Sequence, residues 1–322
     1  AHVGGWRRKR PAANARAHLW MVCALLLLSS CRSTPEVTKI GLIAPFEGLY
    51  RESGYSALAA MRGALADAGA AELAILPLAL DDGDDPLQAR RTAQKLRADP
   101  TVAAVIGPLT PWAAAGAADE LHTLANWIAP FALTPDAGFV DPGVPAQWAD
   151  AWVAATAKVI QRRGHERLVV AGWTPGWPEY TAAEWATVAG MPVTASDDPA
   201  AVGPDDAVLW LGSAADGAAY LNALREGNES ASFWLSPQAA NSIFSARANH
   251  PTNVYWTIWT TVEYNPEIAP NFPVAPDAQL IYLAARQALQ SLTPTPSSTP
   301  AQWQLQVFEL LADGESVPAP AD

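Results

Sequence analysis

Residues 78–108 read LALDDGDDPLQARRTAQKLRADPTVAAVIGP and carry the strongest signals for the fold of this chain. This stretch begins within an aliphatic run, Leu73–Leu80, whose composition is typical of a buried strand. Asp85 is a favourable helix N-cap, and Pro86 suits the first helical position because an N–H there would have no intrahelical partner. A second apolar run, Val102–Ile106, follows the helix. The stretch therefore predicts a strand, a helix and another strand in succession.

The same alternation continues on both sides of this stretch. In one helical segment the apolar residues recur at spacings of three and four before Gly69: Leu58, Met61, Leu65 and Ala68. The other predicted strands are Lys39–Ala44, Trp127–Leu133, Arg167–Ala171, Ala207–Leu211, Ser232–Leu235 and Val254–Trp259. Strands that are apolar on both faces and separated by helices indicate parallel sheets covered by helices on each side. We therefore expect a doubly wound α/β fold.

Length and composition exclude several classes of protein. At roughly 150 residues per domain, the 322 residues suggest two domains. The chain is 50% hydrophobic and 16% charged, which excludes intrinsic disorder for most of its length. The 32 acidic residues outnumber the 20 basic ones, for a net charge of −12, and this argues against a nucleic-acid partner.

The N-terminal residues have the layout of an export signal. Residues 1–30 combine a basic head with the apolar run Leu19–Leu28, which is too short to span a membrane. Cys31 follows Leu28-Ser29-Ser30, and this tetrapeptide resembles a bacterial lipobox, whose cysteine becomes diacylated. The resemblance implies a lipoprotein signal peptide over 1–30, a lipidated Cys31, a linker over 31–36 and attachment to a membrane surface. The alternative is an ordinary signal peptide with an incidental cysteine.

Several motifs resemble those of one family of binding proteins. They are Ile40–Pro45 with Gly48, Tyr50 and Gly54; Asp81-Asp82 with Asp85-Pro86; Val102–Pro108; Ile128-Ala129-Pro130; and Thr134-Pro135. In this order they resemble the type I periplasmic binding proteins, the leucine-binding family that serves branched-chain amino-acid ABC transporters. The resemblance implies two α/β lobes joined by crossover strands, with a ligand cleft between them at the carboxyl ends of the strands, the general place for ligands in open α/β sheets.

The resemblance also suggests a division of the chain. Lobe I is expected over 37–147 plus about 255–292, and lobe II over 148–254. A Pro/Thr/Ser linker over 293–300, a β segment over 301–317 and a tail over 318–322 complete the prediction.

Candidate ligand contacts follow from the same resemblance. They are Tyr50, Thr110, Trp112, Asp136, Ala137, Gly138 and Trp177. Family members hold a ligand carboxylate and amine with hydroxyl groups, whereas this chain has Pro111 and Gly138 at two of the hydroxyl positions. A standard aliphatic amino acid is therefore not the expected ligand. Asp136 either contacts a cationic or hydroxyl-bearing group or caps the following turn, and Trp177 lies either at the site or in the core.

No motif for catalysis is present. The acidic run at Asp81, Asp82, Asp84 and Asp85 lacks the spacing of a calcium-binding EF-hand loop, so we interpret it as a solvated loop that contains an N-cap. The histidines lack zinc-hydrolase spacing, and neither a nucleophile elbow nor a phosphate-binding loop occurs. We expect no enzyme, cofactor or metal.

Two functions fit these observations. The first is a lipid-anchored extracytoplasmic solute-binding protein that presents an amino-acid-like, amide or other compact solute to the permease subunits of an ABC importer. The second is a sensor or envelope protein-interaction module that keeps the fold with a degenerate cleft, as the departures at Pro111 and Gly138 would allow.

Overall fold

The computed structural model describes residues 37–124, 126–132, 145–261, 269–273, 276–292, 303–311 and 316–319. By its contacts the chain divides between Glu36 and Val37, and all the described elements lie in Val37–Asp322. The predicted signal peptide, Cys31 and the linker over 293–300 lie outside the described residues.

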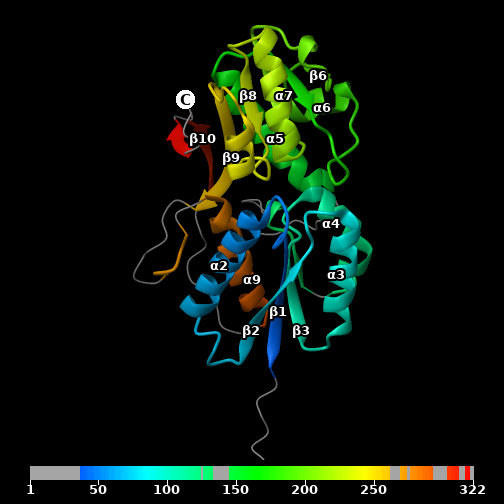
Figure 1. Ribbon diagram of the computed structural model, residues 1–322, viewed down its shortest axis with the longest axis vertical. Helices are drawn as coiled ribbons and strands as arrows, with labels where there is room; N and C mark the ends of the chain where they lie inside the picture. Colours follow the sequence, from blue (N-terminus) through cyan, green and yellow to red (C-terminus); the bar gives the residue numbers. More distant parts are fainter. Residues whose placement is uncertain are drawn as a thin grey trace, which may run out of the picture. The chain divides into compact units, whose positions relative to one another are not determined.

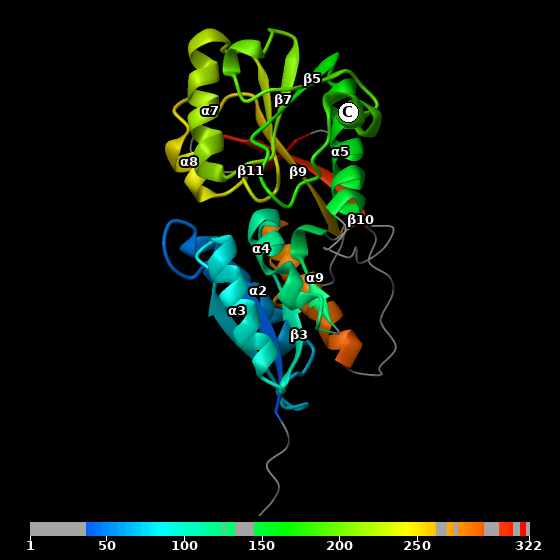
Figure 2. The ribbon, with the colours of Figure 1, turned by 90° about the vertical axis from the view of Figure 1, so that its right-hand side faces the viewer.

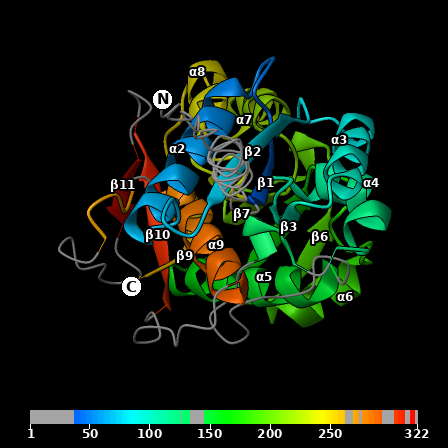
Figure 3. The same cartoon turned by 90° about the horizontal axis from the view of Figure 1, so that it is seen from below.

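The first sheet is parallel and has the strand order β2-β1-β3-β4. Its strands are β1 (Thr38–Ala44), β2 (Ile75–Asp81), β3 (Val102–Ile106) and β4 (Trp127–Ile128). Its helices are α2 (Arg51–Asp67), α3 (Pro86–Ala98), α4 (Pro111–Leu121) and α9 (Pro276–Leu292). Figures 1 and 3 show α2 beside α9 and α3 beside α4, two pairs that are in contact.

The second sheet has seven strands in the order β11-β10-β9-β8-β7-β5-β6. They are β5 (Arg167–Ala171), β6 (Val193–Ala195), β7 (Asp206–Trp210), β8 (Ser232–Leu235), β9 (Val254–Thr261), β10 (Trp303–Leu310) and β11 (Ser316–Ala319). The strands from β9 to β6 are parallel, whereas β10 pairs antiparallel with β9, and β11 pairs antiparallel with β10 at the edge of the sheet (Figure 2). The helices of this half are α5 (Pro145–Arg162), α6 (Ala182–Ala189), α7 (Ala214–Gly227) and α8 (Ser242–Arg247).

Alternating side chains place helices on both faces of each sheet. In β1, Ile40 and Leu42 belong to the buried cluster that includes α2 and α9, while Ile43 belongs to the cluster with α3 and α4. In β7, Val208 packs toward α7 and Leu209 toward α5 and α6. This is the two-residue period of a strand. The prediction of a doubly wound α/β fold is confirmed.

The local signals in residues 78–108 also agree with the structure. Asp85 is the N-cap of α3, and its side chain accepts a hydrogen bond from the Gln88 N–H at 2.8 Å, while Pro86 is the first helical residue. Strand β3 has the predicted bounds, Val102–Ile106.

Three segments differ from the sequence expectation. The strand predicted over Trp127–Leu133 ends at Ile128 and a 3₁₀ turn follows from Pro130, which has no N–H to donate to a ladder. Residues from 255 were expected in lobe I, but β9 pairs with β8 and β10 in the second sheet. Residues 318 and 319, expected in a loose tail, belong to β11 and pair with β10.

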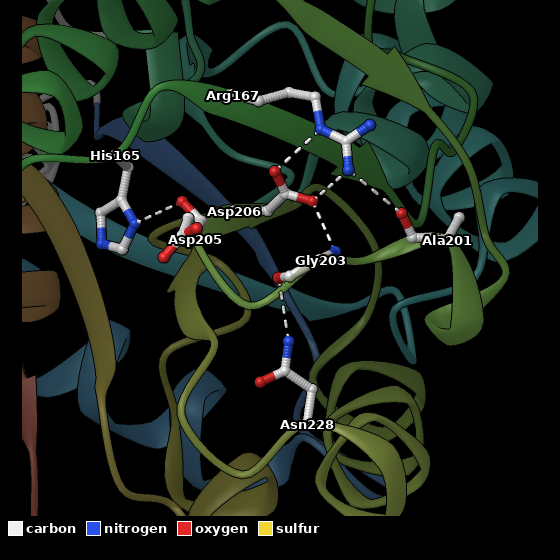
Figure 4. Close-up of polar contacts among 7 residues, drawn as sticks. All are labelled: His165, Arg167, Ala201, Gly203, Asp205, Asp206 and Asn228. Atoms are coloured by element: carbon white, nitrogen blue, oxygen red, sulfur yellow. Dashed lines mark hydrogen bonds and ion pairs between the residues drawn. The ribbon is translucent and has the colours of Figure 1, made fainter.

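An ion pair between Arg167 and Asp206 links the N-terminal ends of the neighbouring strands β5 and β7 (Figure 4). The Arg167 Nε donates to Asp206 Oδ1 at 2.8 Å, and its Nη2 pairs with Oδ2. The Gly203 N–H donates to the same Oδ2 at 2.6 Å, and the Asn228 side chain donates to the Gly203 carbonyl at 2.9 Å. The carboxylate of Asp206 therefore joins two strands and the loop before β7.

Replacing Asp206 by asparagine is expected to lower the free energy of unfolding by about 1–2 kcal/mol at pH 7, since charge-assisted hydrogen bonds are lost while Arg167 stays partly solvated. The hydrogen bond from Arg167 lowers the pKa of Asp206, so the carboxylate stabilises the folded state above its ordinary pKa of about 4, and this contribution is lost as the pH falls through its lowered folded-state pKa. Urea unfolding at pH 7 and pH 3, with the exposed Asp205→Asn as control, should show a difference that shrinks in acid. A difference independent of pH would contradict this account.

Candidate functional site

A cavity of about 90 Å³ is lined by residues from both halves of the fold. This volume is several times the roughly 10–15 Å³ that one water molecule requires. The lining residues from the half that contains the first sheet and α2 are Pro45, Tyr50, Ser53, Ser56, Ala57, Asp84, Leu109, Thr110, Trp112, Pro130 and Phe131. Helix α9 supplies Ala278, Leu280 and Ile281, and the second half supplies Ala214, Pro237, Gln238, Ala240, Asn241 and Ile258. Most of these side chains are apolar, so the cavity suits a compact solute with an apolar body.

The cavity lies beyond the carboxyl ends of several parallel strands. Asp84 follows β2, Thr110 follows β3, and Gln238 follows β8. This is the usual place for a ligand in an open α/β sheet, because loops at these ends converge above the sheet. The topology therefore brings polar side chains from separate loops to one cavity.

The carboxylate of Asp84 is the charged group in the wall. Its Oδ1 accepts hydrogen bonds from Thr110 Oγ1 at 2.8 Å and from Trp112 Nε1 at 3.0 Å. Its other oxygen, Oδ2, has no hydrogen bond with the described residues. Burial raises the pKa of Asp84 to about 6, although the bonds from Thr110 and Trp112 favour the ionised form. Asp84 is thus held in a fixed orientation with one acceptor oxygen uncommitted.

A second buried carboxyl lies directly behind this wall. Asp82 is 1% exposed, and its Oδ1 accepts a hydrogen bond from the Asp84 N–H at 3.0 Å, whereas its Oδ2 has no partner. Burial is the main cause that raises the pKa of Asp82 to about 7. The interpretation of the acidic run as a solvated loop is therefore wrong for Asp82, which is buried, and for Asp84, which is half-buried and held by Thr110 and Trp112. The N-cap at Asp85 is confirmed.

Two contacts join the halves of the fold beside the cavity. The Ala215 N–H at the start of α7 donates to the Tyr50 hydroxyl at 3.5 Å. The Ser242 hydroxyl at the start of α8 donates to Glu52 at 2.8 Å. Both contacts involve the first turn of α2 or the residue before it, so this turn meets the second half next to the cavity.

The predicted contact residues fall into three groups. Tyr50, Thr110 and Trp112 line one cavity together. Trp177 lies in the core: it is 3% exposed, and its ring centroid is 4.7 Å from that of Trp148. The remaining three, Asp136, Ala137 and Gly138, lie outside the described residues. Whether any of these residues contacts a ligand stays a prediction.

Several polar residues of the lining were missed by the sequence reasoning, among them Asp84 and Gln238. Asp84 was assigned to a solvated loop, although its position three residues beyond a parallel strand places it at the carboxyl edge of the sheet. Gln238 lies three residues beyond β8, and its buried Oε1 has no hydrogen-bond partner. For Gln238 as well, its position just beyond the carboxyl end of a parallel strand is the sequence signal that could have identified it.

Other kinds of site find no support in the described part of the chain. Across these residues, no three or more His, Cys, Asp or Glu side chains come together as a metal site would require. None of the helices built from them is both long and apolar enough to cross a membrane.

The structure resembles solved structures of solute-binding proteins. A possible leucine/isoleucine/valine-binding protein from Rhodopirellula baltica has 15% identity and a TM-score of 0.64, over 90% of this chain and 98% of its own. The branched-chain amino acid transporter substrate-binding protein LivJ from Streptococcus pneumoniae, in complex with isoleucine, has 14% identity and a TM-score of 0.58, over 88% and 100%. An ABC-transporter solute-binding protein from R. palustris, in complex with benzoate, has 14% identity and a TM-score of 0.61, over 88% and 95%.

These likenesses establish the fold, which is that of the type I periplasmic binding proteins. The sequence itself matches no protein-family model and no curated protein. At 14–15% identity the likeness does not carry a ligand from those proteins to this chain.

Proposed function

We propose that this chain is an extracytoplasmic solute-binding protein that captures a compact small molecule and presents it to the permease subunits of an ABC importer. The observation that carries the proposal is the cavity, because residues from both sheets line it. A solute held there contacts both halves at once, and its binding energy favours the arrangement in which they meet. The solved structures of the same fold with isoleucine or benzoate bound add support.

The contacts beside the cavity fit such a mechanism. The bonds from Ala215 to Tyr50 and from Ser242 to Glu52 lie beside the cavity, where the two halves meet. Bonds of this kind contribute modestly, about 1 kcal/mol each, so these two add little to the free energy that holds the halves together.

The proposal is tested by a thermal-shift panel on the full chain. The panel contains amino acids, amides, amines, aromatic acids and sugars, and tryptophan fluorescence serves as a second readout because the chain has 14 tryptophans. A compound present at 100 times its dissociation constant stabilises the folded state by about 2.7 kcal/mol. We expect at least one compound to raise the melting temperature. A folded chain that responds to none would favour the sensor or interaction module instead.

We also propose that Cys31 carries the lipid that holds the protein at the extracytoplasmic face of a bacterial membrane. The support is the basic head and apolar run that precede Leu28-Ser29-Ser30-Cys31. Acyl chains contribute about 0.8 kcal/mol per buried CH₂, so two of them give firm attachment.

Replacing Cys31 by alanine is expected to abolish incorporation of an alkyne-labelled fatty acid in a bacterial host. The matched control is Cys23→Ala, which removes the other cysteine of the chain from within the apolar run and should leave the label in place. Label retained by the Cys31 variant would refute the proposed anchor.

A further inference from the structure

We propose that the solute is an amine with a compact apolar body and no carboxylate, and that Asp84 binds its cationic group. This inference rests on the proposed function, since it assigns the ligand class of the same cavity. The structure assigns the role to Asp84 through the orientation of its carboxylate, the charges of the lining and the apolar walls around it.

The hydrogen bonds of Asp84 leave one of its carboxylate oxygens, Oδ2, free to accept a hydrogen bond from a ligand. Thr110 and Trp112 both donate to Oδ1. The other oxygen, Oδ2, bonds to none of the described residues and is not fully buried. A carboxylate held by two donors loses little freedom when it accepts a further hydrogen bond. Its pKa of about 6 leaves Asp84 mostly ionised at pH 7.5. An ammonium group can therefore both donate to Oδ2 and neutralise the charge.

The rest of the described lining offers no cationic partner to an anionic ligand. No Lys, Arg or His is found among the described residues that surround the cavity. The Thr110 hydroxyl and the Trp112 indole N–H already donate to Asp84, so neither is available to a ligand carboxylate. A carboxylate placed here would meet the like charge of Asp84 without a compensating cation, and burial of an unpaired charge is costly.

The remaining walls specify the body of the ligand. Leu109, Phe131, Ile258, Leu280 and Ile281 supply apolar surface, which stabilises a buried ligand by about 0.8 kcal/mol per methylene group. Gln238 also belongs to the lining, together with the polar side chains of Ser53, Ser56 and Asn241. The uncommitted Oδ2 of Asp84 in a largely apolar cavity matches a ligand that carries an N–H donor.

The test compares four probes of similar size on the full chain at pH 7.5 by isothermal titration calorimetry. They are isopentylamine, its neutral analogue isopentanol, the carboxylate 4-methylpentanoate and the zwitterion leucine. We expect isopentylamine to bind at least tenfold more tightly than each of the others. Asp84→Asn should weaken isopentylamine binding about 10- to 100-fold, the effect of one hydrogen bond between charged groups, and should change isopentanol binding less than about twofold.

The control variant is Asp85→Asn, which alters the adjacent exposed carboxylate and keeps a good N-cap. It should bind isopentylamine as the unaltered chain does. The order of affinities among the four probes tests the inference on the unaltered protein even if the Asp84 variant fails to fold. The inference is overturned, and the proposed function stands, if leucine or 4-methylpentanoate binds as tightly as isopentylamine. It is also overturned if Asp84→Asn leaves isopentylamine binding unchanged. If none of the four probes binds, the inference fails, and the wider panel then decides the proposed function.

Discussion

Replacing Trp210 by alanine is expected to lower the free energy of unfolding by about 3–5 kcal/mol. Trp210 ends β7 and is 5% exposed, and three glycines leave room for its ring: a Cβ added at Gly172, Gly212 or Gly217 would lie 2.7–2.8 Å from an indole atom. Alanine at 210 cannot fill this space, because the glycines have no side chains that could move into it. The Ser213 carbonyl, which accepts the indole N–H at 2.9 Å, would also lose its partner.

Urea unfolding checks this prediction through the midpoint of the transition at an unchanged slope. The matched control is Trp173→Ala, since Trp173 is 40% exposed and its loss should cost about 1 kcal/mol or less. Equal losses in the two variants would show that the glycine-lined space around Trp210 closes up when the ring is removed.

Replacing Ser53 by tryptophan is expected to weaken solute binding at least 100-fold. Ser53 lies in the first turn of α2, is half-buried and lines the cavity, so an indole there occupies the space that a ligand would need. The side chain is not part of a packed core, and we therefore expect the loss of stability to stay within the roughly 1–3 kcal/mol typical of overpacking.

The control for this variant is Ala59→Trp, which adds the same ring to an exposed position of the same helix. Each variant is titrated with the compound that gives the largest thermal shift in the unaltered chain. Binding that survives in the folded Ser53 variant would place the solute outside this cavity.

The fold was largely predictable because its signals are local. Each apolar run of residues 78–108 lies between recognisable helix starts and ends, and the cap at Asp85 with Pro86 behind it is satisfied by nearby atoms alone. The predictions were wrong where pairing between strands distant in sequence determines the sheet to which a segment belongs. The residues of Val254–Thr261 by themselves do not indicate whether the strand belongs to the first sheet or the second. Its pairing with β8 and β10 depends on packing across the whole second half.

The candidate site was predictable only in part. Tyr50, Thr110 and Trp112 come from loops at strand ends, and the resemblance identified these loops. Asp84 was missed because four carboxylates within five residues suggest a solvated loop, and only its partners Thr110 and Trp112 show that it is held in the cavity wall. Trp177 illustrates the converse case: an aromatic residue after a strand can face the core, where Trp148 and Trp152 surround it.

A crystal structure of the full chain with the compound that gives the largest thermal shift tests the central claim most directly. We expect density for the compound within the cavity, in contact with Asp84 or Thr110 on one side and with Gln238 or Ile258 on the other. A compound bound elsewhere on the protein, with neither half of the cavity lining in contact with it, would contradict the account.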